Sequence, residues 1–222
     1  MRRFSRIHVL LASLVLLAAV AHSANGSFEA ELAEIQSEWA AANYSSASEH
    51  AKVESLAALT KRADAFVAAN RTRAEPLIWQ GIVLSTYAGA KGGLSALKFA
   101  KQSRGALEAA IKIDPNALDG SAYTSLGTLY SKVPGFPLGF GDDAKAREYL
   151  ERALAMNSDG IDPNFFYGEF LYEAGKHDQA LEHLHKALRA RARPDRELAD
   201  AGRRKEIETL IARISKQQLA KH

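Results

Sequence analysis

Apolar residues recur every three or four positions along most of the chain, which is the spacing that keeps side chains on one face of a helix. The stretches 28–48, 50–69, 94–113 and 196–220 each show such a stripe. Residues 75–88 are apolar over much of a helical circumference, which predicts a central, buried helix. We therefore expect an all-α protein.

Two helix–turn–helix units share one motif of small and apolar residues. The first places Tyr123, Leu126, Gly127 and Tyr130 before Ala146, Leu150, Ala153 and Leu154. The second places Tyr167, Gly168, Leu171 and Tyr172 before Ala180, Leu184, Ala187 and Leu188. Glycine inside a helix costs about 1 kcal/mol relative to alanine. Its recurrence at one register predicts that a partner helix crosses there, with Ala146 and Ala180 facing it.

This motif resembles the tetratricopeptide repeat. The second unit has the expected step of twelve residues from Gly168 to Ala180, whereas the first has seven extra residues between its helices. A weaker unit lies at 75–115, where Ser103 replaces the alanine. The resemblance implies antiparallel helix pairs stacked as a superhelix, clearest at 117–156 and 163–194. The stretch 196–220 is expected to be the capping helix of the stack.

The first 24 residues show the pattern of a secretory signal peptide. Three arginines among the first six residues precede an apolar run over 7–21, and small residues predict cleavage near Ala21–Ala24. A spanning helix needs about 20 apolar residues, which disfavours an uncleaved anchor. We expect export to the bacterial periplasm, with no spanning segment after cleavage and a single domain over 25–222. The chain has no cysteine, so it has neither disulfides nor a lipidation site.

The charge of the chain changes once the signal is set aside. The remaining residues hold 26 basic and 26 acidic side chains, so the basic isoelectric point is no evidence for nucleic-acid binding. Residues 186–222 are net +6 and residues 25–185 are net −6. A solvated capping helix beside an acidic body explains this asymmetry, and an acidic partner or an anionic membrane surface is the alternative.

The stretch from Lys132 to Asp142 interrupts the first unit with an unusual composition. It contains two prolines, three glycines and the apolar residues Phe136, Leu138 and Phe140. A solvated connection does not need these apolar side chains. The loop either packs between repeats and sets their angle, or offers an apolar surface for binding. Asp142 or Asp143 is expected to cap the following helix.

A search for catalytic chemistry finds no motif. A cysteine nucleophile, a Gly-x-Ser-x-Gly elbow and a His-Glu-x-x-His pair are all missing from the sequence. The glycines at 89–93 lack the ending of a phosphate-binding loop and are expected only to break a helix. His183 and His185 point to different helix faces, which disfavours a metal site. We predict a non-catalytic protein without metal or cofactor, in which the acidic residues after position 194 form ion pairs with arginines.

Four stretches taken together narrow the resemblance. They are Ile111–Pro115, Ala117–Tyr123, Lys132–Asp142, and Arg193–Arg196 followed by Asp200 and Arg203–Ile207. They resemble the T-component family associated with TRAP-type transporters, a group of secreted or lipid-anchored bacterial repeat proteins. The resemblance covers most of 75–215. It implies a helical repeat protein that works beside a periplasmic solute-binding protein and offers a hydrophobic pore or pocket. The chain departs from the anchored members because it lacks a lipidation cysteine.

Repeat proteins usually bind on their concave face, and aromatic residues of the repeats are candidates to line it. We predict an adaptor or scaffold that binds a protein partner through this face and the 132–142 loop. The alternative is a carrier of an apolar small ligand, or an accessory component of a TRAP-type uptake system. The residues expected to bind the partner or ligand are Tyr123, Tyr130, Lys132, Pro134, Phe136, Pro137, Phe140 and Tyr167.

Overall fold

The computed structural model of the chain describes residues 26–220. The predicted signal peptide at 1–24 lies outside the described residues. Two compact units are distinguished, Met1–Glu34 and Ile35–His222. The described residues of the first are helical, and the single domain expected over 25–222 stays a prediction.

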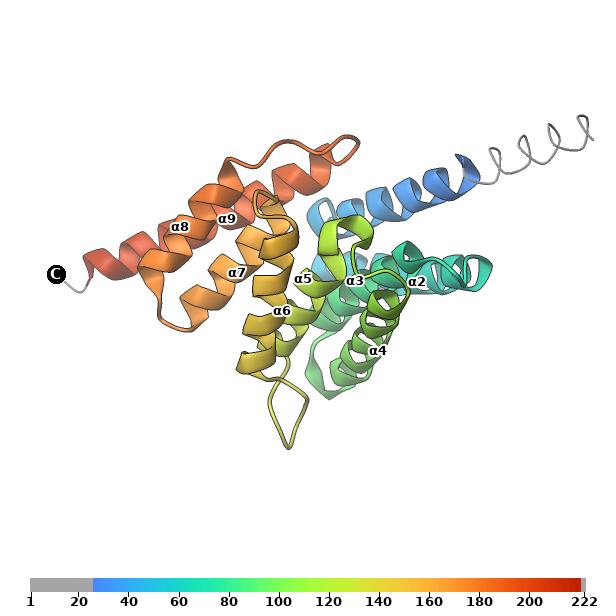
Figure 1. Cartoon of the computed structure of the whole chain (residues 1–222), viewed down its shortest axis with the longest axis horizontal. Helices are drawn as coiled ribbons and strands as arrows, with labels where there is room; N and C mark the ends of the chain where they lie inside the picture. The colour runs from blue at the N-terminus through green and yellow to red at the C-terminus, as the bar shows by residue number, and fades with distance from the viewer. Residues whose placement is uncertain (1–25, 221–222) are drawn as a thin grey trace, which may run out of the picture. The chain divides into compact units, whose positions relative to one another are not determined.

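The second unit is built of helices joined by short connections (Figure 1). Residues 35–44 form the first helical stretch. The helices that follow are α2 (Glu49–Ala69), α3 (Ala74–Lys91), α4 (Gly93–Ile113), α5 (Ala117–Lys132), α6 (Asp143–Met156), α7 (Ile161–Glu173), α8 (His177–Leu188) and α9 (Glu197–Leu219). None of the helices among residues 26–220 is long and apolar enough to cross a membrane.

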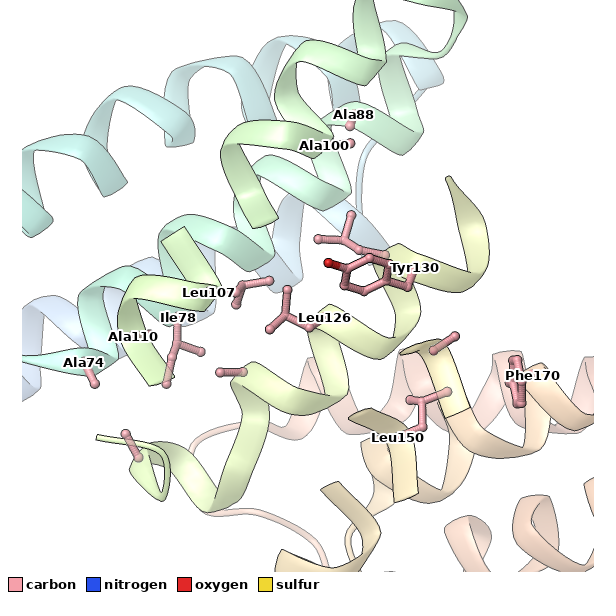
Figure 2. Packing of buried hydrophobic residues seen from close by; sticks show 14 residues of the cluster. Ala74, Ile78, Ala88, Ala100, Leu107, Ala110, Leu126, Tyr130, Leu150 and Phe170 are labelled. Carbon is pink, nitrogen blue, oxygen red and sulfur yellow. The ribbon is translucent and has the colours of Figure 1, made fainter. Parts of the chain in front are cut away.

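The helices pack as successive antiparallel pairs, α3 with α4, α5 with α6 and α7 with α8, and α9 packs against α7 and α8. The predicted all-α, tetratricopeptide-like fold class is confirmed. The core of the first two pairs contains Leu107 of α4, Leu126 of α5 and Leu150 of α6, all fully buried (Figure 2). A second cluster joins α7 and α8 to Ile207 and Ile214 of α9.

The helical glycines sit where the sequence motif placed them, at the crossings within each pair. A Cβ added at Gly127 would lie 2.5 Å from Leu150 Cγ and 3.1 Å from the Ala146 carbonyl oxygen. A Cβ at Gly168 would lie 3.2 Å from the Ala180 carbonyl oxygen. The predicted close approach of Ala146 and Ala180 is therefore confirmed.

Local sequence explains where several helices begin and end. The Ser48 side chain caps α2, and the Asp142 carboxylate accepts from the backbone N–H groups of Ala144 and Lys145 at 3.0 and 3.1 Å. Asp142 is thus the cap that the sequence predicted. The helix break expected over 89–93 lies at Gly92, whose φ of +63° suits glycine.

The start of α5 is irregular, because Leu118, Asp119 and Gly120 all have left-handed backbone angles. Non-glycine residues in this region cost on the order of 1 kcal/mol each. The regular part of α5 therefore begins near Ser121. This part of α5 packs against both α3 and α7.

Candidate binding site

The face shared by α3, α5 and α7 contains a cavity of about 340 Å³. The stretch 35–44 contributes Trp39 and Asn43 to its wall, and the segment 193–203 contributes Arg193, Arg196 and Arg203. The chain therefore covers part of its own repeat face and leaves a cavity that is partly open to solvent. Its volume lies at the lower end of the range of about 300–1,000 Å³ that is usual for small-molecule sites.

Two tryptophans form one wall of this cavity. Trp39 and Trp79 are 7% and 3% exposed, and their rings meet edge to face with centroids 5.9 Å apart. Trp39 Nε1 donates to Thr86 Oγ1 at 2.9 Å, which fixes the stretch 35–44 against α3. Because Trp79 belongs to α3, this wall joins the start of the unit to its first repeat pair.

The face of α5 that lines the cavity is polar. Ser121, Thr124, Ser125 and Thr128 follow one another at helical spacing, and Lys132 ends the row. Lys132 forms an ion pair with Glu169 at 3.1 Å and another with Glu173, both on α7. The cavity thus has hydroxyl groups on one side and tryptophan rings on another.

A cluster of arginines and carboxylates joins α7 to α9 beside the cavity. Asp162 accepts from Arg193 at 2.6 Å and from Arg203 at 2.8 Å. Arg193 also donates to Asp200 at 2.7 Å through Nε, and Arg203 donates to Glu206 at 2.6 Å. The ion pairs expected after position 194 are confirmed for Asp200 and Glu206.

Burial and neighbouring charge act against each other in this cluster. Burial on its own raises the pKa of Asp162, but Arg203 and Arg193 outweigh it and the pKa is lowered. Burial raises the pKa of Glu206, although Arg203 acts the other way. Burial also raises the pKa of Tyr44, whose hydroxyl donates to Glu206 at 3.3 Å, to about 12.

Arg196 has a different environment from the two arginines beside it. Its guanidinium lies 5.1 Å from the centre of the Trp79 ring. Within residues 26–220, no acceptor lies within hydrogen-bonding distance of Arg196 Nε or of Trp79 Nε1. Burial lowers the pKa of Arg196, and the positive charge of Arg193 lowers it further.

A second cavity of about 710 Å³ adjoins the first and shares Trp79, Asp162 and Arg196 with it. It is bounded by the irregular start of α5 at Leu118 and Asp119, and by the connection from α8 to α9. Arg191 lines only this second cavity. Arg196 and Trp79 therefore stand where the two cavities meet.

The loop between α5 and α6 is a separate feature, which extends beyond the ends of both helices (Figure 1). Its base is fixed, because Gly141 N–H donates to the Pro134 carbonyl at 2.9 Å and Asp142 N–H donates to the Tyr130 carbonyl at 3.0 Å. Phe140 packs edge to face on Tyr130 at 5.5 Å, and the guanidinium of Arg104 lies 4.4 Å from the centre of its ring. The tip is solvated, with Phe136 93% exposed and Leu138 70% exposed.

The eight residues predicted to bind do not form one site. Lys132 lines the cavity of about 340 Å³, whereas Phe136 and Pro137 lie at the exposed tip of the loop. Pro134 is also exposed, but its carbonyl belongs to the base, where it accepts from the Gly141 N–H. Phe140 belongs to the packed base of the loop. The three tyrosines instead pack against neighbouring helices.

Tyr123 and Tyr130 are buried and lie against Tyr149 of α6, with centroids 6.1 and 5.6 Å from its ring. Tyr167 lies against His183 of α8 and donates its hydroxyl to Glu151 at 3.0 Å. These contacts belong to the packing between helices, and none of the three side chains lines the cavity of about 340 Å³.

Sequence reasoning did not select the cavity residues Trp39, Trp79 and Arg196 as binding residues. Trp39 was part of the apolar stripe of 28–48, and Trp79 was part of the apolar stretch 75–88 and opened the weak unit at 75–115. Such a pattern does not tell a cavity wall from a core position. Arg196 belongs to the stretch Arg193–Arg196 that carries the family resemblance, so the sequence signal was present but had no role attached.

Comparisons with known proteins agree with this architecture. A family model described as "Tetratricopeptide repeat" matches residues 138–206. A solved structure of a thermophilic tetratricopeptide-repeat protein from Thermus thermophilus is similar with a TM-score of 0.53 and 17% sequence identity, covering 87% of this chain and 97% of that one. A search of curated proteins found no match. Residues 138–206 therefore match the tetratricopeptide repeat, and the fold of the chain is tetratricopeptide-like.

Proposed function

We propose that this protein is a non-catalytic adaptor of the bacterial periplasm that binds a protein partner through its 132–142 loop and the adjoining repeat face. Tetratricopeptide repeats typically mediate contacts between proteins, which supports a binding role. The apolar run and arginines of the first 24 residues support export. A solute-binding protein of a TRAP-type uptake system is the partner that the T-component resemblance favours.

The exposed tip of the loop is the observation that carries this proposal. Phe136 and Leu138 are held out from a base fixed by backbone hydrogen bonds and by the packing of Phe140. Burying one such side chain in a partner contributes about 1.5–3 kcal/mol. A fixed base also reduces the entropy that is lost when the loop is held in a complex.

The test begins with affinity capture of the mature protein from a periplasmic extract, followed by mass spectrometry. The captured partner is then titrated against the wild type and against a double variant with Phe136→Ser and Leu138→Ser. We expect the double variant to bind at least tenfold more weakly, with an unchanged free energy of unfolding because both side chains are solvated.

Leu94→Ser is the matched control, since Leu94 is also 93% exposed but lies at the start of α4. It should bind as the wild type does. A double variant with full affinity would exclude the loop tip as the contact.

The cavity supports a second candidate function, that of a small-ligand carrier serving solute uptake. It lies on the face that repeat proteins use for binding, and the chain's own stretch 35–44 and Arg193–Arg203 enclose it in part. The two tryptophans of the sequence, Trp39 and Trp79, both line this cavity. Ligand entry should therefore change the intrinsic tryptophan fluorescence, and a chain that responds to no small ligand would lose this candidate function.

A further inference from the structure

Arg196 is the one arginine of the cavity wall that has no carboxylate bonded to it within the described chain. Arg193 is bonded to Asp162 and Asp200, and Arg203 is bonded to Asp162 and Glu206. Its Nε is removed from water without an acceptor, whereas the buried polar groups of native proteins are nearly always hydrogen-bonded.

The nearby carboxylates are already engaged. Asp162 accepts from two arginines, Asp200 accepts from both the side chain and the backbone N–H of Arg193, and Glu206 accepts from Arg203 and Tyr44. Turning Arg196 toward any of them would compete with a bond of 2.6–2.9 Å. Arg196 therefore makes no ion pair with a carboxylate of residues 26–220, and its side chain lines the cavity.

Other groups line the same cavity beside Arg196. Its guanidinium lies over the Trp79 ring, 5.1 Å from the ring centre. Ser121 and Ser125 present hydroxyl groups from α5. Trp39, Ile82 and Phe166 supply apolar surface. Apolar walls with a few convergent polar groups are the usual composition of a small-molecule site.

We propose that the cavity of about 340 Å³ binds a small monocarboxylate with an apolar body, whose carboxylate pairs with Arg196 and whose body lies against Trp39 and Trp79. A guanidinium matches a carboxylate through two parallel hydrogen bonds, which favours a carboxylate over other polar groups. Lys132, at the end of α5, also lines the cavity, but it is already paired with Glu169 and Glu173. One arginine thus faces one carboxylate, and the proposal rests on the ligand-carrier candidate function given above.

The test titrates the full chain with phenylacetate and, separately, with phenylacetamide. The two probes share shape and apolar body but differ in charge, and the fluorescence of Trp39 and Trp79 reports on the cavity. We expect phenylacetate to bind at least tenfold more tightly than phenylacetamide. Calorimetry of the same titrations gives an independent dissociation constant.

Variants assign the preference to Arg196. Arg196→Gln should lower phenylacetate affinity at least tenfold and remove the preference, whereas Arg196→Lys should restore part of it through its charge. Arg191→Gln is the control, because Arg191 lines only the adjoining cavity. Thermal unfolding followed by circular dichroism shows that each variant is folded, and if Arg196→Gln does not fold, the comparison of the two probes on the wild type decides.

The outcomes separate this proposal from the function on which it rests. Equal affinity for the two probes would overturn the carboxylate site while leaving a small-ligand cavity. Retention of the preference in Arg196→Gln would also overturn the role of Arg196. If neither probe binds at millimolar concentration by fluorescence or by calorimetry, the carboxylate proposal falls. The carrier candidate falls only if no other small ligand binds either, and the loop-mediated partner function is unaffected.

Discussion

At the residue scale, glycine has opposite effects at different places in these helices. Gly127 lies at a crossing, where a Cβ would meet Leu150 and the Ala146 carbonyl. Gly105, within α4, has no atom of another segment within 4 Å of such a Cβ. The same change to alanine therefore meets a packed partner helix in one case and open space in the other.

We expect Gly127→Ala to destabilise the protein by about 1–2 kcal/mol, because overpacking by about 1–3 kcal/mol exceeds the gain in helix propensity. Gly105→Ala should raise the free energy of unfolding by about 0.5–1 kcal/mol. Urea unfolding of both variants measures the difference. If Gly127→Ala proves as stable as Gly105→Ala, close helix approach is not the reason for the glycine.

The motif of two glycines at one register was enough to predict this packing from sequence. The step between glycine and alanine gave the antiparallel pairing of α7 with α8, and the same register identified the α5–α6 pair despite the longer loop. The spacing relates a glycine only to the next helix along the chain. It can therefore be read from sequence even where the rest of the fold is unknown.

At the element scale, ion pairs join α7 to α9 and to the connection that precedes α9. Asp162 in the first turn of α7 is bonded to Arg203 of α9 and to Arg193 in the connection before it. The side chain of Arg203 is 9% exposed, so its charge is largely withdrawn from water. The cluster therefore fixes the capping helix against α7 as long as Asp162 is ionised.

The lowered pKa of Asp162 gives this attachment a pH dependence. A carboxyl group whose pKa is lower in the folded than in the unfolded protein contributes stability above its unfolded value, near 3.9, and loses it as the pH falls through the folded value. We expect the free energy of unfolding to fall below about pH 4. Asp162→Asn should lose about 3 kcal/mol at pH 7 and show a flatter acid limb. Parallel pH profiles of the two proteins would contradict this role.

The loop between α5 and α6 shows where prediction from sequence ended at this scale. Its apolar content was visible, but two interpretations remained, packing or exposure. Each interpretation applies to one part of the loop. Phe140 at the base packs on Tyr130, and Phe136 at the tip is solvated. The difference depends on the backbone bonds from Gly141 to Pro134 and from Asp142 to Tyr130, which composition alone does not specify.

At the scale of the Ile35–His222 unit, the first and last helical segments contact each other. Tyr44 packs directly on Gly202 of α9, and its hydroxyl reaches Glu206. In an open repeat stack each unit contacts only its neighbours. The same two ends of the unit also supply residues to the cavity wall, Trp39 and Asn43 from 35–44 and three arginines from 193–203. Repeat periodicity carries no information about contacts between segments so far apart in sequence.

We expect Gly202→Ala to destabilise the protein by about 1–3 kcal/mol, because a Cβ there would collide with the Tyr44 ring. In the wild type, tryptophan fluorescence reports on the start of this unit, where both tryptophans lie, and circular dichroism reports on all of its helices. Because the two ends contact each other, we expect the two unfolding transitions to coincide. Two separate transitions in the wild type would show that the ends unfold independently.

The contact of Tyr44 with Gly202 also determines when the fold can be completed during synthesis. Its partners are 158 residues apart, so a growing chain cannot make this contact until α9 has been translated. The entropic cost of closing so long a loop rises only slowly with its length. The contact is therefore late because of the order in which the chain is translated, and not because it is costly to form. Repeat pairs can form as they emerge, but the contact between the first and last helical segments is made last, and a chain interrupted before α9 lacks this contact and the Arg203 side chain of the cavity wall.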